Sequence, residues 1–478
     1  NFMPMIGERN IAISIIRRFM KYLNKIIEYG LYLLVFLLPW QTRWIIKAGE
    51  INGGYLEYGT ISLYGVDIIL IILLILFAFN KFLFCSLSEK KDNENQSEQS
   101  SNFAQECRGK ISTTWWLIGF LDLFIFISIF FASDRVLAIY RYGVFLLGVG
   151  LFWLITSVKY NKVKLIWSLI IGLLIQAMIA TWQFIWQADF SSKWLGMAQH
   201  QASELGTSVI EIVGLGGVVE RWLRAYGGLD HPNILGGVLV VGIFFILILI
   251  VKNLKSDGET SRQNLILFSI FCILFTALVF SFSRASWLGI AVGILFLLIF
   301  TIIKKDLFLQ REVLKIILTG SVLFFLFSNL YSGLFGARLI RGSNRLEIKS
   351  SIERSEGYSE SWEIIKSNWV TGVGIGNYTL AVSKKTIEKK AWDYQPAHNI
   401  FLLVWAEIGI LGFLVWLGLL GWLGWEIIKR KRAIYFAIFL SIIIMMMFDH
   451  WWWSLHFGVL FFWLVASLLI KNNGKIKQ

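Results

Sequence analysis

The sequence predicts an all-α, polytopic integral membrane protein with about twelve transmembrane helices and a large, partly helical loop outside the membrane. Hydrophobic residues make up 56% of the 478 residues and charged residues only 16%, whereas charged residues are about 25% of an ordinary soluble domain. The apolar residues come in blocks of about 18–24, the length that crosses a hydrocarbon core of roughly 30 Å. Short basic segments separate these blocks, as expected for loops between membrane spans.

Each block is expected to be helical, because lipid offers no partner for an unpaired backbone amide. The predicted spans cover approximately residues 27–44, 65–83, 114–132, 137–157, 164–186, 231–251, 264–282, 286–303, 313–331, 400–425, 433–449 and 453–470. The chain then divides into residues 1–331 with the first nine spans and a disordered cytosolic linker at about 84–113, residues 332–399 as the large outside loop with a helical centre near 359–369, and residues 400–478 with the last three spans and a cytosolic tail.

The positions of the basic residues predict the orientation. Most Lys and Arg residues, including the run 429–432, fall in loops on one side, which the positive-inside rule assigns to the cytosol. Both termini are therefore expected in the cytosol, and the first span is expected to be an uncleaved anchor in the cytoplasmic (inner) membrane. The net charge of +14 belongs to these loops, so membrane lipid rather than nucleic acid is the expected partner. Cys85, Cys107 and Cys272 are expected to be free thiols.

Three segments at the predicted outer face carry candidate site residues, because a charge near membrane depth is costly. The first is RAYGGLDHPNILGG, residues 224–237. Arg224 and His231 flank a glycine pair, and a guanidinium here is suited to hold a phosphate through paired hydrogen bonds. The alternative is that Arg224 lies at the interface with its stem in lipid.

The second segment is FSFSRASWLG, residues 280–289. Arg284 lies in a turn between two apolar spans, and Ser281, Ser283 and Ser286 surround it in sequence. The alternative is an interfacial anchor that ends the hairpin. An anchor needs no such group of hydroxyls, so the pattern favours a functional arginine.

The third segment is AHNIFLLVWAEIGILG, residues 397–412. The imidazole of His398 could accept a proton from a hydroxyl, although a histidine at a helix start is also often a cap or an interfacial residue. Gly409 and Gly412 are spaced for close helix packing, and Glu407 in the same helix would need a partner.

Two outward arginines and one outward histidine form a coherent site in which Arg224 and Arg284 bind a pyrophosphate and His398 activates a hydroxyl. The spacing of cysteines and histidines predicts no metal site. A pair of acidic residues for glycoside hydrolysis is not evident, but Glu347, Glu353 and Glu356 leave that chemistry open.

These motifs resemble the O-antigen ligase and O-antigen polymerase superfamily of bacterial envelope glycosyltransferases. The ligase signature is matched by His398-Asn399, nine residues, and Gly409-x-x-Gly412. The two arginine segments resemble the arginine motifs of the family, and residues 362–378 (WEIIKSNWVTGVGIGNY) resemble its loop helix and glycine turn. Arg354 matches an arginine commonly found before that helix.

The resemblance implies metal-independent, inverting transfer of a glycan from undecaprenyl pyrophosphate to a glycan or lipid acceptor, without a cofactor. On that basis His398, Arg284 and Arg224 are the expected catalytic residues. Arg354, His231 and Asn399 are expected to bind substrate, and the site is expected to face outward.

Ligase activity is the first expectation, and a polymerase or an enzyme that transfers to protein hydroxyls are alternatives within the superfamily. A polysaccharide transporter or flippase is the alternative from another class, but it would place charges near the bilayer midplane. A purely structural role leaves the polar residues around Arg284 and the outward His398 unexplained.

Overall fold

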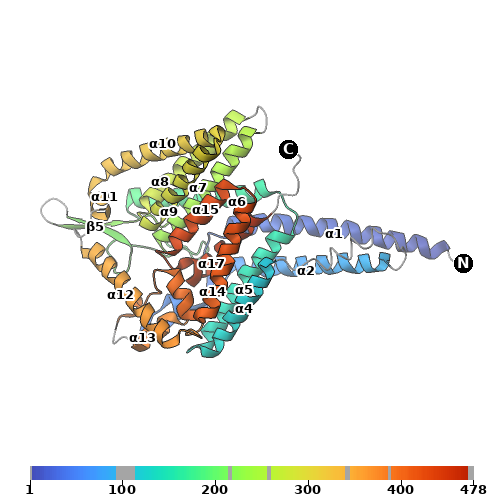
Figure 1. The fold of residues 1–478 in the computed structure, drawn as a ribbon, viewed down its shortest axis with the longest axis horizontal. Helices are drawn as coiled ribbons and strands as arrows, with labels where there is room; N and C mark the ends of the chain where they lie inside the picture. The colour runs from blue at the N-terminus through green and yellow to red at the C-terminus, as the bar shows by residue number, and fades with distance from the viewer. Residues whose placement is uncertain are drawn as a thin grey trace.

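The computed structural model describes residues 3–92, 113–213, 218–255, 260–339, 345–385 and 389–471. Helices account for most of it, and the described strands form only three two-stranded sheets. The long helices pack into one bundle, from which α1 and α2 extend together (Figure 1). The structure confirms the all-α, polytopic class.

Every predicted span coincides with a helix. These helices are α1 (Met3–Leu37), α2 (Gly65–Asp92), α4 (Thr113–Ser128), α5 (Arg135–Ser157), α6 (Lys162–Trp186), α7 (Pro232–Lys255), α8 (Thr260–Phe280), α9 (Arg284–Lys304), α10 (Leu307–Leu330), α14 (Ile400–Lys429), α15 (Ala433–Met446) and α17 (His456–Ile470). Within the described residues, nine of them are long and apolar enough to cross a membrane. The exceptions are α1, which is long, and α15 and α17, which are apolar but have only 14 and 15 residues.

Three predicted boundaries are wrong. The first span was expected to reach residue 44, but α1 ends at Leu37 because Pro39 follows it. The last two spans were expected to be nearly continuous, but a turn and the short helix α16 (Trp451–Ser454) separate α15 from α17. The linker expected from residue 84 begins as helix, because α2 continues to Asp92; residues 93–112 lie outside the described part. Cys107 lies there, and neither Cys85 nor Cys272 forms a disulfide among the described residues.

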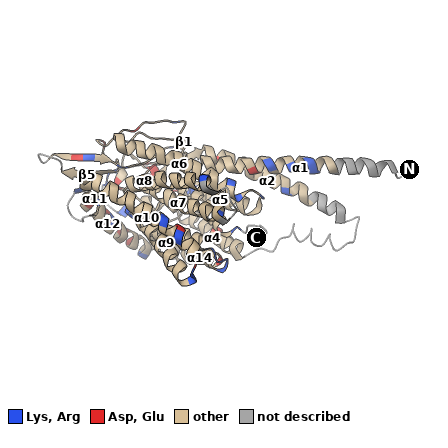
Figure 2. Ribbon diagram, turned by 90° about the horizontal axis from the view of Figure 1, so that it is seen from above, with Lys and Arg blue, Asp and Glu red and all other residues tan. Residues whose placement is uncertain are grey.

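The two ends of the bundle differ in chemistry. At one end, called the basic end here, Lys and Arg side chains bind the last carbonyl groups of α5 and α17. Lys162 Nζ donates to the Leu468 carbonyl at 2.8 Å, and Lys471 Nζ donates to the Ile155 carbonyl at 2.7 Å. Cations at helix C-termini are favoured by the helix dipole. Between the ends, α7 carries no charged residue before Lys252 and is the most buried of the nine candidate spans among the described residues. Figure 2 marks the charged residues along the ribbon.

The other end, called the site end here, carries the turns α4–α5, α8–α9 and α15–α17 and the long connections. The loop after α10 contains α11 (Ser332–Leu339), α12 (Arg345–Asn368), α13 (Tyr378–Lys385) and the 3₁₀ turn η4 (Ala391–Asp393). This loop is thus partly helical, as predicted, and the expected helix near 359–369 is the second half of α12.

Small antiparallel sheets, which the sequence analysis did not predict, also lie in the connections at the site end. They pair β1 (Arg43–Lys47) with β4 (Ile61–Tyr64), β2 (Glu50–Ile51) with β3 (Gly54–Tyr55), and β5 (Val209–Val213) with β6 (Val219–Leu223). The 3₁₀ turns η1 (Glu57–Gly59) and η2 (Ile129–Phe131) complete the described elements at this end. The hairpin β5–β6 contacts the loop helices, since Arg345 of α12 donates to Glu211 of β5 at 3.0 Å.

Helix α14 is broken at Gly409, which has φ 72° and ψ 177°. The turn after α12 fits into the break: the Val373 amide donates to the Ala406 carbonyl and the Ile410 amide donates to the Trp369 carbonyl, each at 2.9 Å. The prediction that Gly409 packs against another helix is therefore wrong, because Gly409 contacts this turn. The atoms nearest to a side chain at Gly412 belong to Ile408 of the same helix. The break joins the loop helices to α14 within three turns of its start.

Replacing Gly409 by alanine should destabilise the protein. A Cβ there would lie 1.9 Å from the Val370 carbonyl oxygen, and this backbone conformation, essentially reserved for glycine, costs another residue about 1–3 kcal/mol. We expect a clearly lower midpoint of thermal unfolding for purified Gly409→Ala. The matched control is Gly421→Ala in the same helix, where a Cβ meets no atom within 4 Å. Equal midpoints for the two variants would contradict this account of the break.

Candidate functional site

His398 lies at the site end, immediately before α14. The side chain of Asn399 caps the helix, since its Oδ1 accepts from the amides of Phe401 at 2.9 Å and Leu402 at 3.2 Å. This cap fixes where α14 begins and therefore where His398 stands. The helix cap gives a structural reason for an asparagine at position 399. The direct role of Asn399 in substrate binding remains a prediction.

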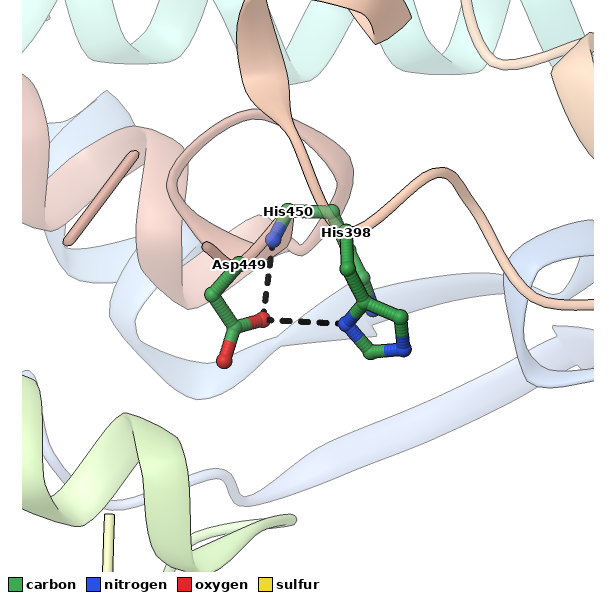
Figure 3. A group of neighbouring side chains, drawn as sticks. All are labelled: His398, Asp449 and His450. Atoms are coloured by element: carbon green, nitrogen blue, oxygen red, sulfur yellow. Dashed lines mark hydrogen bonds and ion pairs between the residues drawn. The ribbon is translucent and has the colours of Figure 1, made fainter. Parts of the chain in front are cut away.

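A carboxylate that the sequence analysis did not single out faces His398. Asp449, in the turn after α15, is only 4% exposed, and its Oδ1 lies 4.0 Å from His398 Nδ1. The same oxygen accepts from the His450 amide at 2.8 Å, while Oδ2 accepts from Asn233 Nδ2 at 2.8 Å. Figure 3 shows His398 Nδ1 directed at Asp449 and the second ring nitrogen directed away. Asp449 thus faces the histidine from one side, at a distance longer than a hydrogen bond.

Arg224 is buried and bound to three segments of the protein. Its Nε donates to the Ser281 carbonyl at 2.8 Å, Nη1 to Ser208 Oγ at 2.6 Å, and Nη2 to Asn233 Oδ1 at 2.8 Å. A guanidinium so placed does not lie in lipid, so the interfacial alternative is wrong. Because Asn233 also donates to Asp449, a hydrogen-bonded chain runs from Arg224 through Asn233 to the carboxylate beside His398.

Arg284, the first residue of α9, contacts the loop. Its Nη1 lies 3.0 Å from Glu347 Oε2, and the other oxygen of Glu347 is paired with Arg338 of α11. Arg338 also donates from Nε to the Phe282 carbonyl at 3.0 Å. Glu347 thus serves two arginines, an arrangement that does not suit a general acid for glycoside hydrolysis. Glu353 is paired with Lys349 at 3.3 Å, and the Glu356 carboxylate lies 4.0 Å from Lys389 Nζ.

The serines near Arg284 act on the backbone and on one another. Ser283 Oγ caps α9 and lies 2.9 Å from Ser286 Oγ, and Ser281 Oγ donates to the Leu278 carbonyl. These contacts shape the α8–α9 turn. The hydroxyl-rich sequence is therefore explained by the turn, and it no longer argues for a functional arginine by itself.

The arginines form an electropositive group next to the histidines. Burial and then the charge of Arg338 lower the pKa of Arg224, and Arg284 acts in the same direction. Glu347 pairs with two of these three guanidinium groups, those of Arg284 and Arg338, and a net positive group of this kind attracts an anion.

Burial also keeps the nearby imidazoles neutral. It lowers the pKa of His398, an effect that Asp449 opposes and Arg354 strengthens. His231 accepts from the Asn233 amide at 3.1 Å, and burial followed by the charge of Arg224 lowers its pKa to about 3. Burial raises the pKa of Asp449, but His450, His398 and His231 together bring it below its usual value. The site thus combines neutral imidazoles with a charged carboxylate.

The structure brings the sequence-predicted residues to one place. Arg224, Arg284, Arg354, His231, His398 and Asn399 all lie at the site end. The sequence analysis missed Asp449, His450 and Arg338. A signal for the first two was present, because the pair Asp449-His450 interrupts the apolar run MMMFDHWWW, and a carboxylate at the end of a span needs a reason to be there.

Fold and site together define a polytopic helical membrane protein with a histidine that faces a buried carboxylate, and with a group of arginines at the same end of its bundle. Residues 267–417 match a family model described as O-antigen ligase. This match, which runs from α8 into α14, supports the resemblance to the O-antigen ligase superfamily. The matched region contains Arg284, Arg354 and His398, while Arg224 and Asp449 lie outside it. No curated protein matches the chain.

The three hydrogen bonds of Arg224 predict that Arg224→Lys lowers stability. A lysine cannot reproduce the planar arrangement of donors, and leaving buried acceptors unpaired costs about 1–3 kcal/mol. Thermal unfolding of purified protein should show a lower midpoint for this variant. Arg345→Lys is the matched control, because the Arg345 side chain is 77% exposed and its replacement should leave the midpoint unchanged. A wild-type midpoint for Arg224→Lys would show that these bonds do not hold the segments together.

Proposed function

We propose that this protein is a membrane glycosyltransferase that moves a glycan from a polyprenyl-pyrophosphate carrier, undecaprenyl pyrophosphate, to an acceptor hydroxyl, acting as an O-antigen ligase. The observation that carries the proposal is the position of His398, which faces Asp449, while Asn233 connects that carboxylate to Arg224. The family match supports a glycosyltransferase of this kind. The donor, the acceptor and the roles of the residues are parts of the proposal.

The carboxylate determines which nitrogen of His398 can act as a base. Asp449 favours the tautomer with the proton on Nδ1, which leaves the lone pair on Nε2. Nε2 takes the proton of the acceptor hydroxyl as its oxygen attacks the anomeric carbon of the glycan. The bond between that carbon and the pyrophosphate breaks, the configuration inverts, and polyprenyl pyrophosphate leaves. Asp449 stabilises the imidazolium that forms, as the carboxylate does in other histidine–carboxylate pairs.

The arginines stabilise the leaving pyrophosphate. Arg284, the first residue of α9, is the one proposed to touch it, because its side chain is 29% exposed. Arg224, buried with three protein acceptors, contributes its charge and holds Asn233 in place. Arg338 adds a third cation. Developing negative charge on a leaving group is stabilised most when such charges are already fixed in position.

The charge distribution supports an outward-facing site. The basic end carries Lys162, Arg430, Arg432 and Lys471, so the positive-inside rule assigns it to the cytosol. The site end then faces the outside of the cytoplasmic membrane. The gathering of charged side chains at that end also favours surface chemistry over a transporter, whose charges would lie midway along the helices.

The proposal is tested with purified protein in lipid, a polyprenyl-pyrophosphate-linked glycan and separate acceptors. We expect glycan on an added glycolipid acceptor and release of polyprenyl pyrophosphate, and a loss of at least about 100-fold in rate for His398→Ala, since general base catalysis contributes 10²–10⁴-fold. His200→Ala is the control, because His200 pairs with its own carboxylate, Asp189, and belongs neither to the His398–Asp449 pair nor to the arginine group.

Lengthening of the lipid-linked glycan without a second acceptor would show that the protein is a polymerase and not a ligase. Transfer to a protein hydroxyl would show that it is an oligosaccharyltransferase. Wild-type transfer by His398→Ala would reject the proposed base.

A further inference from the structure

His398, Asp449 and His450 present three metal-ligating side chains to one another. One donor atom from each lies within 4.8 Å of the donor atoms of the other two. Two imidazoles and a carboxylate form a donor set that Zn²⁺ and related divalent ions prefer. They come from two separate parts of the fold, since His398 precedes α14 while Asp449 and His450 are neighbours in the turn after α15 (Figure 3).

The residues around His398, Asp449 and His450 orient these side chains as they would be oriented in a metal site. His398 Nδ1 is buried and has no hydrogen-bond partner among the described residues, and it faces Asp449. The outer polar contacts are in place: Asn233 holds the second oxygen of Asp449, and Ser454 Oγ lies 2.7 Å from His450 Nδ1. Such contacts orient metal ligands. The His398 side chain is 24% exposed, which leaves a route from solvent.

We propose that these three residues bind a divalent transition-metal ion such as Zn²⁺, and that the bound ion inhibits the transferase. Ligands at roughly 2.0–2.1 Å from a tetrahedral Zn²⁺ lie about 3.3 Å apart, so the side chains need to approach by roughly an ångström. Three protein ligands leave the fourth position for water. The inhibitory part rests on the proposed function, whereas the binding part does not.

Inhibition follows from counting protons on the imidazole. A neutral imidazole carries one N–H. When Nδ1 gives its lone pair to the metal, that hydrogen must reside on Nε2, and Nε2 then has no lone pair to accept the proton of a hydroxyl. The ion also neutralises the negative charge of Asp449, which in the metal-free enzyme would stabilise the imidazolium. Metal binding and general base catalysis at His398 therefore exclude each other.

Binding is tested by titrating purified, chelator-treated protein with Co²⁺ and following its visible absorption, which reports tetrahedral coordination. We expect one ion per chain, displaced by Zn²⁺, and at least a tenfold weaker affinity for His450→Gln. His200→Gln is the matched control, because that histidine also pairs with a carboxylate at the site end but lacks a third ligand. Its affinity should equal that of the wild type. No tetrahedral spectrum in the wild type, or the same affinity in His450→Gln, would overturn the site.

Inhibition is tested in the transfer assay with Zn²⁺ and with excess chelator. Wild type and His200→Gln should lose at least tenfold in rate and recover with chelator, while His450→Gln should need at least tenfold more Zn²⁺ relative to its own starting rate. Metal binding without inhibition would overturn the inhibitory role. Failure of metal binding alongside an inactive His398→Ala would reject this inference and leave the proposed function standing.

Discussion

The buried carboxylate of Asp449 is the constraint on which the rest of the site depends. Removing an ionised carboxylate from water costs several kcal/mol unless hydrogen bonds and opposite charge offset the loss. Here the Asn233 amide group and the His450 N–H satisfy it, and His398 faces it. These partners belong to the start of α7, the α15–α17 turn and the start of α14. One charge thus fixes three helix ends together, and Asn233 extends the connection to Arg224.

The break in α14 supplies the second constraint, because it determines where the large loop lies. The turn after α12 binds the open carbonyl and amide groups around Gly409, so α12 is fixed close to His398. The same loop brings Arg338 and Glu347 to Arg284. One glycine from each pattern, Gly372 of GVGIG and Gly409 of Gly-x-x-Gly, takes part in this contact. Their presence at fixed spacing from His398 follows from that contact.

Much of the fold could be predicted from the sequence, because apolar length alone locates a helix in a protein of this class. The site could be predicted where a residue stands in a recognisable segment, as His398, Arg284 and Arg224 do. The position of Asp449 beside His398 could not be predicted from the sequence, because Asp449 lies in a turn about 50 residues later. Only the packing of α14 against the α15–α17 turn shows that the two residues pair. The serines near Arg284 were a misleading argument for a functional arginine, because they cap the helix and bond to the backbone of the turn. The hairpin β5–β6 and the kink at Gly409 depend on contacts between residues that are distant in sequence. The local sequence therefore did not predict either feature, and the apolar pattern around Gly409 predicted an unbroken helix.

The kinetics of Asp449→Asn test the central claim most directly. Asparagine keeps the size of the side chain and can still accept from Asn233, but it removes the charge that holds the His398 tautomer and stabilises the imidazolium. The account predicts that kcat for glycan transfer falls by at least about 100-fold, while KM for the lipid-linked donor stays close to wild type. The unfolding midpoint should also fall, because asparagine has one acceptor oxygen for the two N–H donors that Asp449 binds. A wild-type kcat, or an increase in KM with kcat unchanged, would contradict a positioning role for Asp449 and with it the proposed base.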